Sequence, residues 1–140
     1  MQQPYERLKA WEHAHRLYAA VHEATKSWPR EERFELTSQV RRAAFSVPAN
    51  IAEGAGKLGP KEFRKALDIA HGSLFELSYG LHAARQFGYL SAESWAQIEP
   101  IRDEASRVLW ALLKAVAARS GKNGSKSPSH APLAPNAPSD

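Results

Sequence analysis

The sequence predicts an all-α fold, an up-down-up-down antiparallel four-helix bundle. In four successive stretches the apolar residues recur three or four positions apart, which is the spacing of one buried helix face. Short segments with proline, glycine or mixed charge separate these stretches, and nowhere do apolar and polar residues alternate as in a strand. The chain has 140 residues, 43% of them apolar, which suits one domain with one packed core.

The first predicted helix begins near Leu8 and ends before Pro29. Its apolar face comprises Leu8, Trp11, Ala14, Tyr18 and Val21. Residues 28–35 combine a proline with mixed charge, so we expect a loop there.

The second predicted helix, residues 36–54, carries Pro48 near its middle. Its core face comprises Leu36, Val40, Ala43, Val47, Ile51 and Gly54. A proline inside a helix removes a backbone hydrogen bond and bends the axis. The local alternative is a break at Val47 with Pro48 opening a new helix. Because the apolar spacing continues in phase past Pro48, we favour one bent helix.

This second helix has two further faces. Five hydrogen-bonding side chains share one edge and are expected to hold a neighbouring helix, which Gly54 allows to come close; they are Gln39, Arg42, Ser46, Asn50 and Glu53. The far side carries small or apolar residues where a solvated helix would carry charge, namely Phe45, Pro48, Ala49 and Ala52. We interpret that second apolar face as an oligomer interface.

The third predicted helix begins at Pro60 and ends before Gly88. Its apolar face comprises Phe63, Leu67, Ala70, Leu74, Leu77, Leu81 and Ala84. Ser91 is expected to cap a fourth helix, locally bent at Pro100. The apolar face of the fourth helix comprises Trp95, Ile98, Ile101, Ala105, Val108, Leu112 and Val116. The bundle is expected to span residues 1–119, and residues 120–140 to form a disordered tail, either an incidental extension or a weak electrostatic tether.

Motifs for cofactors, metals and catalysis are weak. The glycines of residues 54–59 match the letters of a dinucleotide fingerprint, but a helix rather than a strand precedes them. The spacings Glu12-His15 and Asp68-His71 imitate the metal motif of helical bundles, but both acids are expected to turn toward solvent. We predict no cofactor, no metal and no catalysis. The absence of cysteine, of a signal core and of any membrane-spanning run predicts a cytoplasmic protein.

A formal net charge of +4 makes an anionic partner plausible. Basic residues are expected to gather where the second helix ends and the third begins, namely Arg41, Arg42, Lys57, Lys61, Arg64 and Lys65. Such a patch would neutralise phosphates without reading sequence. The alternative is a solvated face with Arg42 paired internally to Glu53 or Glu76.

Three segments carry a family resemblance: QVRRAAFSVPANIAEG at residues 39–54 with Phe63 beyond it, GSLFEL at residues 72–77, which includes Ser73 and Glu76, and GYL at residues 88–90. From about Tyr5 to Arg119 the chain resembles the four-helix bundle family of 23S ribosomal RNA intervening-sequence proteins. These are similar in fold to the accessory variability determinants of diversity-generating retroelements. The resemblance implies a barrel-like homopentamer with a basic surface. For the retroelement relatives it implies binding of nucleic acid and of a reverse transcriptase.

The expected function is therefore a non-catalytic homo-oligomer, a pentamer by resemblance, that binds RNA or other nucleic acid. The alternative is a protein-interaction scaffold, for example an accessory subunit of a retroelement reverse transcriptase. Within the motif we assign Ser46, Asn50 and Glu53 to structure, because polar side chains beside a proline bend can fix the neighbouring helix.

Overall fold

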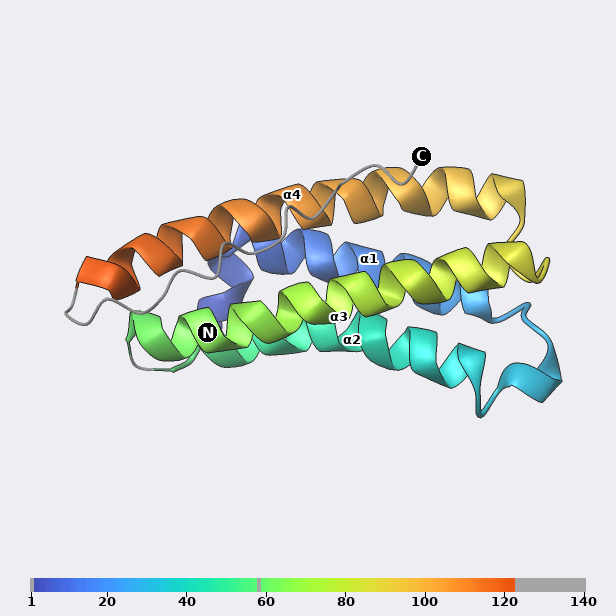
Figure 1. Ribbon diagram of the computed structural model, residues 1–140, viewed down its shortest axis with the longest axis horizontal. Coiled ribbons are helices and arrows are strands. Elements are labelled where there is room, and N and C mark those ends of the chain that lie inside the picture. Colours follow the sequence, from blue (N-terminus) through green and yellow to red (C-terminus); the bar gives the residue numbers. More distant parts are fainter. Residues whose placement is uncertain (1, 58, 123–140) are drawn as a thin grey trace.

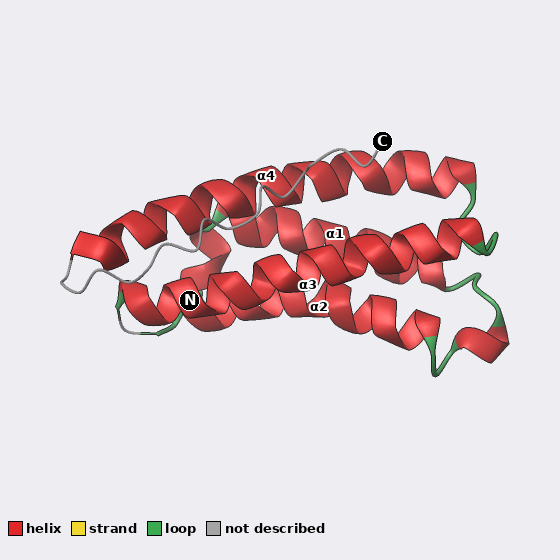
Figure 2. Cartoon of the chain, viewed as in Figure 1, coloured by secondary structure: helices red, strands yellow, loops and turns green. Residues whose placement is uncertain are grey.

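A computed structural model describes residues 2–57 and 59–122, which form a bundle of four helices (Figure 1). The helices are α1 (Lys9–Thr25), α2 (Leu36–Ala55), α3 (Pro60–Gln86) and α4 (Ala92–Lys122). Two short 3-10 helices, Pro4–Arg7 and Arg30–Glu32, precede α1 and α2. Between residues 2 and 122 the described chain contains no strand (Figure 2). The all-α four-helix prediction is confirmed.

Consecutive helices run in opposite directions (Figure 1). In the α2–α3 pair, Val40 near the start of α2 lies against Gly80 late in α3, whereas Gly54 at the end of α2 lies against Phe63 at the start of α3. Helices α1 and α4 also pack on each other, which closes the ring of four. The core fills the space that all four helices surround.

Helix α2 continues without a break through Pro48. The preference for one helix over two is therefore correct, and the bend at Pro48 stays a prediction. The prediction that Pro48 lies on the outer apolar face is wrong, because Pro48 is buried within its own bundle. The flank of α2 that carries Pro48 also carries Phe45, whose ring packs edge-on against Tyr18 of α1 at 5.6 Å between centroids. Helix α1 thus packs against part of the side of α2 that the apolar spacing predicted to face away from the bundle.

The helix ends follow the expected chemistry. Gly59 and Gly88 have positive φ angles of 90° and 81°, which favour glycine. After α3, the amide of Tyr89 donates to the carbonyl of Ala84 at 2.8 Å, which closes a left-handed helix terminus. The hydroxyl of Ser91 accepts a hydrogen bond from the Ser94 amide at 3.0 Å and so caps α4.

Helix α4 differs from the expectation in two ways. It continues past Arg119 to Lys122, and the remainder of the predicted tail lies outside the described residues. Its fully buried residues include Leu109 and Leu113, whereas Val108 and Leu112 are only half-buried. The buried face of α4 is therefore rotated from the predicted one, because α4 packs against both α1 and α3.

Two glycines allow α2 and α3 to approach closely. A Cβ atom at Gly54 would lie 2.8 Å from the Cβ of Ala66 and 2.7 Å from Cδ1 of Phe63. A Cβ atom at Gly80 would lie 2.6 Å from Cγ2 of Val40. These separations are shorter than carbon atoms tolerate, so an alanine at either position would push the two helices apart.

Replacing Gly54 with alanine should lower the free energy of unfolding. Alanine gains about 0.5–1 kcal/mol over glycine inside a helix, but overpacking costs about 1–3 kcal/mol. The matched control is Gly72→Ala in α3, where the added Cβ meets nothing within 4 Å, so that variant should be the more stable one. Urea unfolding of both variants checks this, and equal stabilities would contradict the close approach.

Candidate functional site

A group of cations, here called the basic turn, lies where α2 ends and α3 begins. Lys57 is in the connection, and Lys61, Arg64 and Lys65 are in the first two turns of α3. Lys57 Nζ lies 3.2 Å from a carboxylate oxygen of Glu53, and Lys65 Nζ lies 3.5 Å from one of Glu62. Both pairs are solvent-exposed and therefore weak. Within residues 2–57 and 59–122, Lys61 and Arg64 have no charged partner.

Arg41 and Arg42 do not belong to the basic turn, so the predicted single patch of six cations is wrong. They lie in the second turn of α2, 15 residues before Lys57 in the case of Arg42, which corresponds to roughly 20 Å along a helix. Arg41 Nε instead donates to Thr25 Oγ1 at the end of α1, at 2.7 Å. A tight helical turn brings together only residues near it, and these two arginines are too far from it.

The alternative pairing of Arg42 with Glu53 or Glu76 does not occur among the described residues. Glu53 is paired with Lys57, and Glu76 is exposed. Arg42 is itself exposed and has no hydrogen-bonding or charged partner among the described side chains. Arg42 is thus a free cation on the outer side of α2, separate from the basic turn.

A polar contact, here called the polar seam, joins α2 to α3. The hydroxyl oxygens of Ser46 and Ser73 lie 2.7 Å apart. Asn50 Nδ2 donates to the carbonyl oxygen of Ser46 at 2.8 Å and to its hydroxyl at 2.9 Å. Of the predicted polar edge, Ser46 and Asn50 thus take part in the contact, whereas Gln39 is exposed and bonds to no described side chain of α3.

The predicted oligomer face remains accessible on the single chain. Phe45 is 54% exposed, and Ala49 and Ala52 are partly exposed. On α3, Ile69 and Tyr79 are 56% and 73% exposed, and neither belongs to the apolar face that the spacing predicts. Ten residues separate them, so at 3.6 residues per turn they lie roughly 80° apart around α3, both outside the predicted core face. We call these five residues the outer face of α2 and α3.

The motifs resembling metal sites are engaged in other contacts. Glu12 lies 3.9 Å from Arg16, and the ring of His15 stacks on Trp11 with 5.1 Å between centroids. In the described part of the chain, no three side chains of histidine, aspartate or glutamate form a metal-binding group.

Over the same residues, no helix is both long and apolar enough to cross a membrane.

The family model described as "23S rRNA-intervening sequence protein" matches residues 6–111. The chain belongs to this family. No curated protein matches the chain. The span shared with the 23S rRNA-intervening sequence proteins contains the polar seam, the basic turn and the outer face, while residues 112–140 lie beyond it. All three features therefore belong to the family's part of the chain.

The polar seam can be tested with a serine substitution. Ser46→Ala removes the contact to Ser73 and leaves that buried hydroxyl without its α2 partner. It should reduce the free energy of unfolding by about 1–2 kcal/mol relative to the control. The matched control is Ser38→Ala, because Ser38 lies in the same helix and has no hydrogen-bond partner among the described residues. Equal unfolding midpoints in urea would show that the seam contributes nothing.

Proposed function

We propose that this 23S rRNA-intervening sequence protein is a non-catalytic homo-oligomer that binds RNA, or other nucleic acid, through phosphate groups. The basic turn is the observation that carries the proposal. It places four cations on adjoining turns, and Lys61 and Arg64 have no carboxylate among the described residues to neutralise them. The family description, which names 23S rRNA, supports RNA as the ligand class. A cytoplasmic setting follows from that ligand class.

The chemistry of the basic turn favours phosphate contact over base recognition. Lys57 and Lys65 hold their carboxylate partners weakly in water, so a phosphate can replace them at little cost. The aromatic residue of this region, Phe63, is half-buried and packs on the core. A half-buried ring offers no open platform for base stacking. We therefore expect binding that depends on charge and not on base sequence.

The salt dependence of binding tests the basic turn. Replacing Lys61 and Arg64 with alanine should weaken binding to a labelled single-stranded RNA. It should also reduce the slope of log K against log salt by about 1.4, since each phosphate contact contributes about 0.7. The matched control removes one lysine and one arginine near the opposite end of the bundle, with Lys26→Ala and Arg30→Ala.

Fluorescence anisotropy over a salt series measures both slopes. An equal loss in the two double variants would contradict the assignment to the basic turn. Binding that is absent or independent of salt would reject the nucleic-acid proposal. That result would favour the alternative function, a protein-interaction scaffold that recognises a partner such as a reverse transcriptase through protein contacts.

The outer face supports the oligomeric part of the proposal. Single exposed apolar side chains are common on monomers, whereas several on one side of a molecule are typical of an interface. Phe45, Ile69 and Tyr79 are all more than half exposed, and burial against a second copy would remove them from water. Five subunits are proposed on the strength of the family resemblance.

A charge placed on the outer face should prevent assembly. We expect Phe45→Glu to reduce the particle mass toward the 15.5 kDa of one chain, because a buried unpaired carboxylate is strongly unfavourable in an interface. The matched control is Phe34→Glu, since Phe34 is 81% exposed and lies in the α1–α2 connection. Multi-angle light scattering measures mass, and circular dichroism verifies helix content. Unchanged mass for Phe45→Glu would exclude this face.

A further inference from the structure

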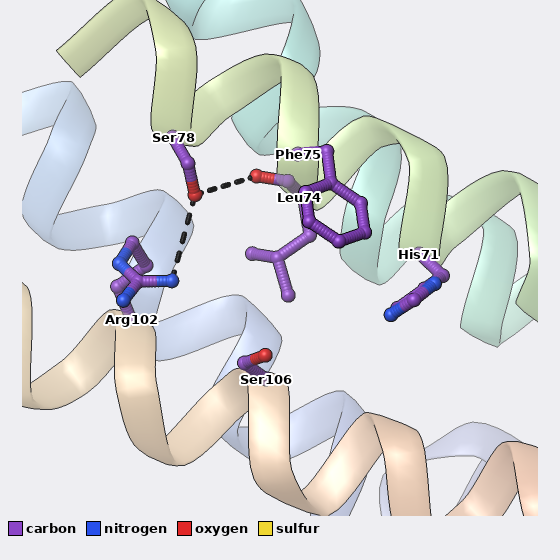
Figure 3. Close-up of a pocket in the computed structure, with 6 residues that line it drawn as sticks. All are labelled: His71, Leu74, Phe75, Ser78, Arg102 and Ser106. Carbon is purple, nitrogen blue, oxygen red and sulfur yellow. Dashed lines mark hydrogen bonds between the residues drawn. The ribbon is translucent and has the colours of Figure 1, made fainter. Parts of the chain in front are cut away.

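A small cavity lies between α3 and α4, away from the basic turn and the outer face of α2 (Figure 3). It is lined by His71, Leu74, Phe75, Ser78, Arg102 and Ser106. The cavity offers about 10 Å³ to the centre of a water-sized sphere, which is close to the space that one water molecule needs. Its lining is mixed, with apolar side chains and four polar ones.

Two polar atoms at this cavity lack partners. His71 Nε2 and Ser106 Oγ are fully buried, and neither has a hydrogen-bond partner among the described residues. Figure 3 shows the ring of His71 and the hydroxyl of Ser106 pointing toward the space between them. Buried polar groups in folded proteins are nearly always hydrogen-bonded, to protein or to ordered water. The two atoms therefore indicate a missing partner that touches both helices.

The charge state of His71 limits which ligand can form a hydrogen bond with its Nε2 atom. Burial lowers the pKa of His71, although the nearby Asp68 carboxylate partly opposes that shift. The imidazole is therefore neutral at neutral pH, and Nε2 is either a donor or an acceptor according to the tautomer. Water can serve as donor or acceptor, so it satisfies either tautomer.

We propose that this cavity binds one ordered water molecule, which bridges His71 Nε2 on α3 and Ser106 Oγ on α4. The neighbouring hydroxyl of Ser78 donates to the carbonyl of Leu74 at 2.9 Å and accepts from Arg102 Nη1 at 3.5 Å. Ser78 and the largely buried Arg102 thus complete the polar part of the cavity lining. A water in this position satisfies the polar groups that α3 and α4 bury against each other.

An anion is the other ligand that histidine, arginine and serine side chains commonly bind, and the geometry excludes it. Arg102 already holds Glu99 through two hydrogen bonds of 2.7 Å, from Nε and from Nη2. Its charge is thus neutralised by a carboxylate on its own helix. The cavity also has room for one water and not for a phosphate or sulfate.

The ring of His71 is held in place by aromatic neighbours. It stacks on Trp110 of α4 at 5.4 Å and meets the edge of Phe75 at 5.0 Å between centroids. These contacts keep Nε2 facing the cavity instead of solvent. The bridging water therefore occupies a fixed site, and we expect a residence time long enough to detect by magnetic relaxation.

Oxygen-17 relaxation dispersion of the full chain tests the proposal directly. We expect the wild-type chain to hold one more long-lived water than the Ser106→Val variant, whose added methyl groups fill the cavity. Equal dispersion amplitudes in the two proteins would overturn the proposal. Circular dichroism of the variant verifies that the helices persist.

Thermal unfolding supplies an independent test. With a bridging water, Ser106→Ala should lower the melting temperature relative to the Ser38→Ala control, which corrects for the helix preference of alanine. The double variant Ser106→Ala/His71→Phe should lose less melting temperature than the two single variants lose together, by at least about 3 °C. A dry cavity gives the opposite sign for Ser106→Ala, because the substitution then removes an unsatisfied hydroxyl. A melting temperature that rises on Ser106→Ala would contradict the bridging water. So would decreases for the two single variants that add up to the decrease for the double variant.

Discussion

The close approach of α2 to α3 is the constraint on which the rest of the structure depends. At Gly54 and Gly80 the partner side chains occupy the space where a Cβ atom would lie. Between these two points Ser46 meets Ser73 across the seam. Glycine contacts at both ends and a hydrogen bond in the middle fix the distance between the helices and their register. A slip of one turn would break all three contacts at once.

That register decides what α2 presents on its other sides. Its buried residues include Pro48, and the neighbouring Phe45 packs against Tyr18 of α1. The residues that remain accessible on the apolar outer side include Phe45, Ala49 and Ala52. The same register brings the start of α3 beside the end of α2, which assembles the basic turn. Assembly and nucleic-acid contact, as proposed, would thus use different surfaces of one rigid helix pair.

Periodicity was sufficient to predict the helices, because apolar spacing reports directly on burial, and local chemistry at Pro60, Gly88 and Ser91 marked their ends. Features that depend on how helices pack were not predictable. The burial of Pro48 requires knowing which flank α1 covers. The separation of Arg41 and Arg42 from Lys57 follows from the length of α2. The placement of His71 and Ser106, 35 residues apart, at one cavity requires the register of α3 and α4.

The central claim is that α2 has two packed sides, one within its own bundle and one against a sister subunit. Sedimentation velocity of the full chain over a wide concentration range tests it most directly. We expect a species several times heavier than 15.5 kDa, five times heavier for the proposed pentamer. A single 15.5 kDa species at every concentration would contradict it, because Phe45 and its neighbours would then face only water.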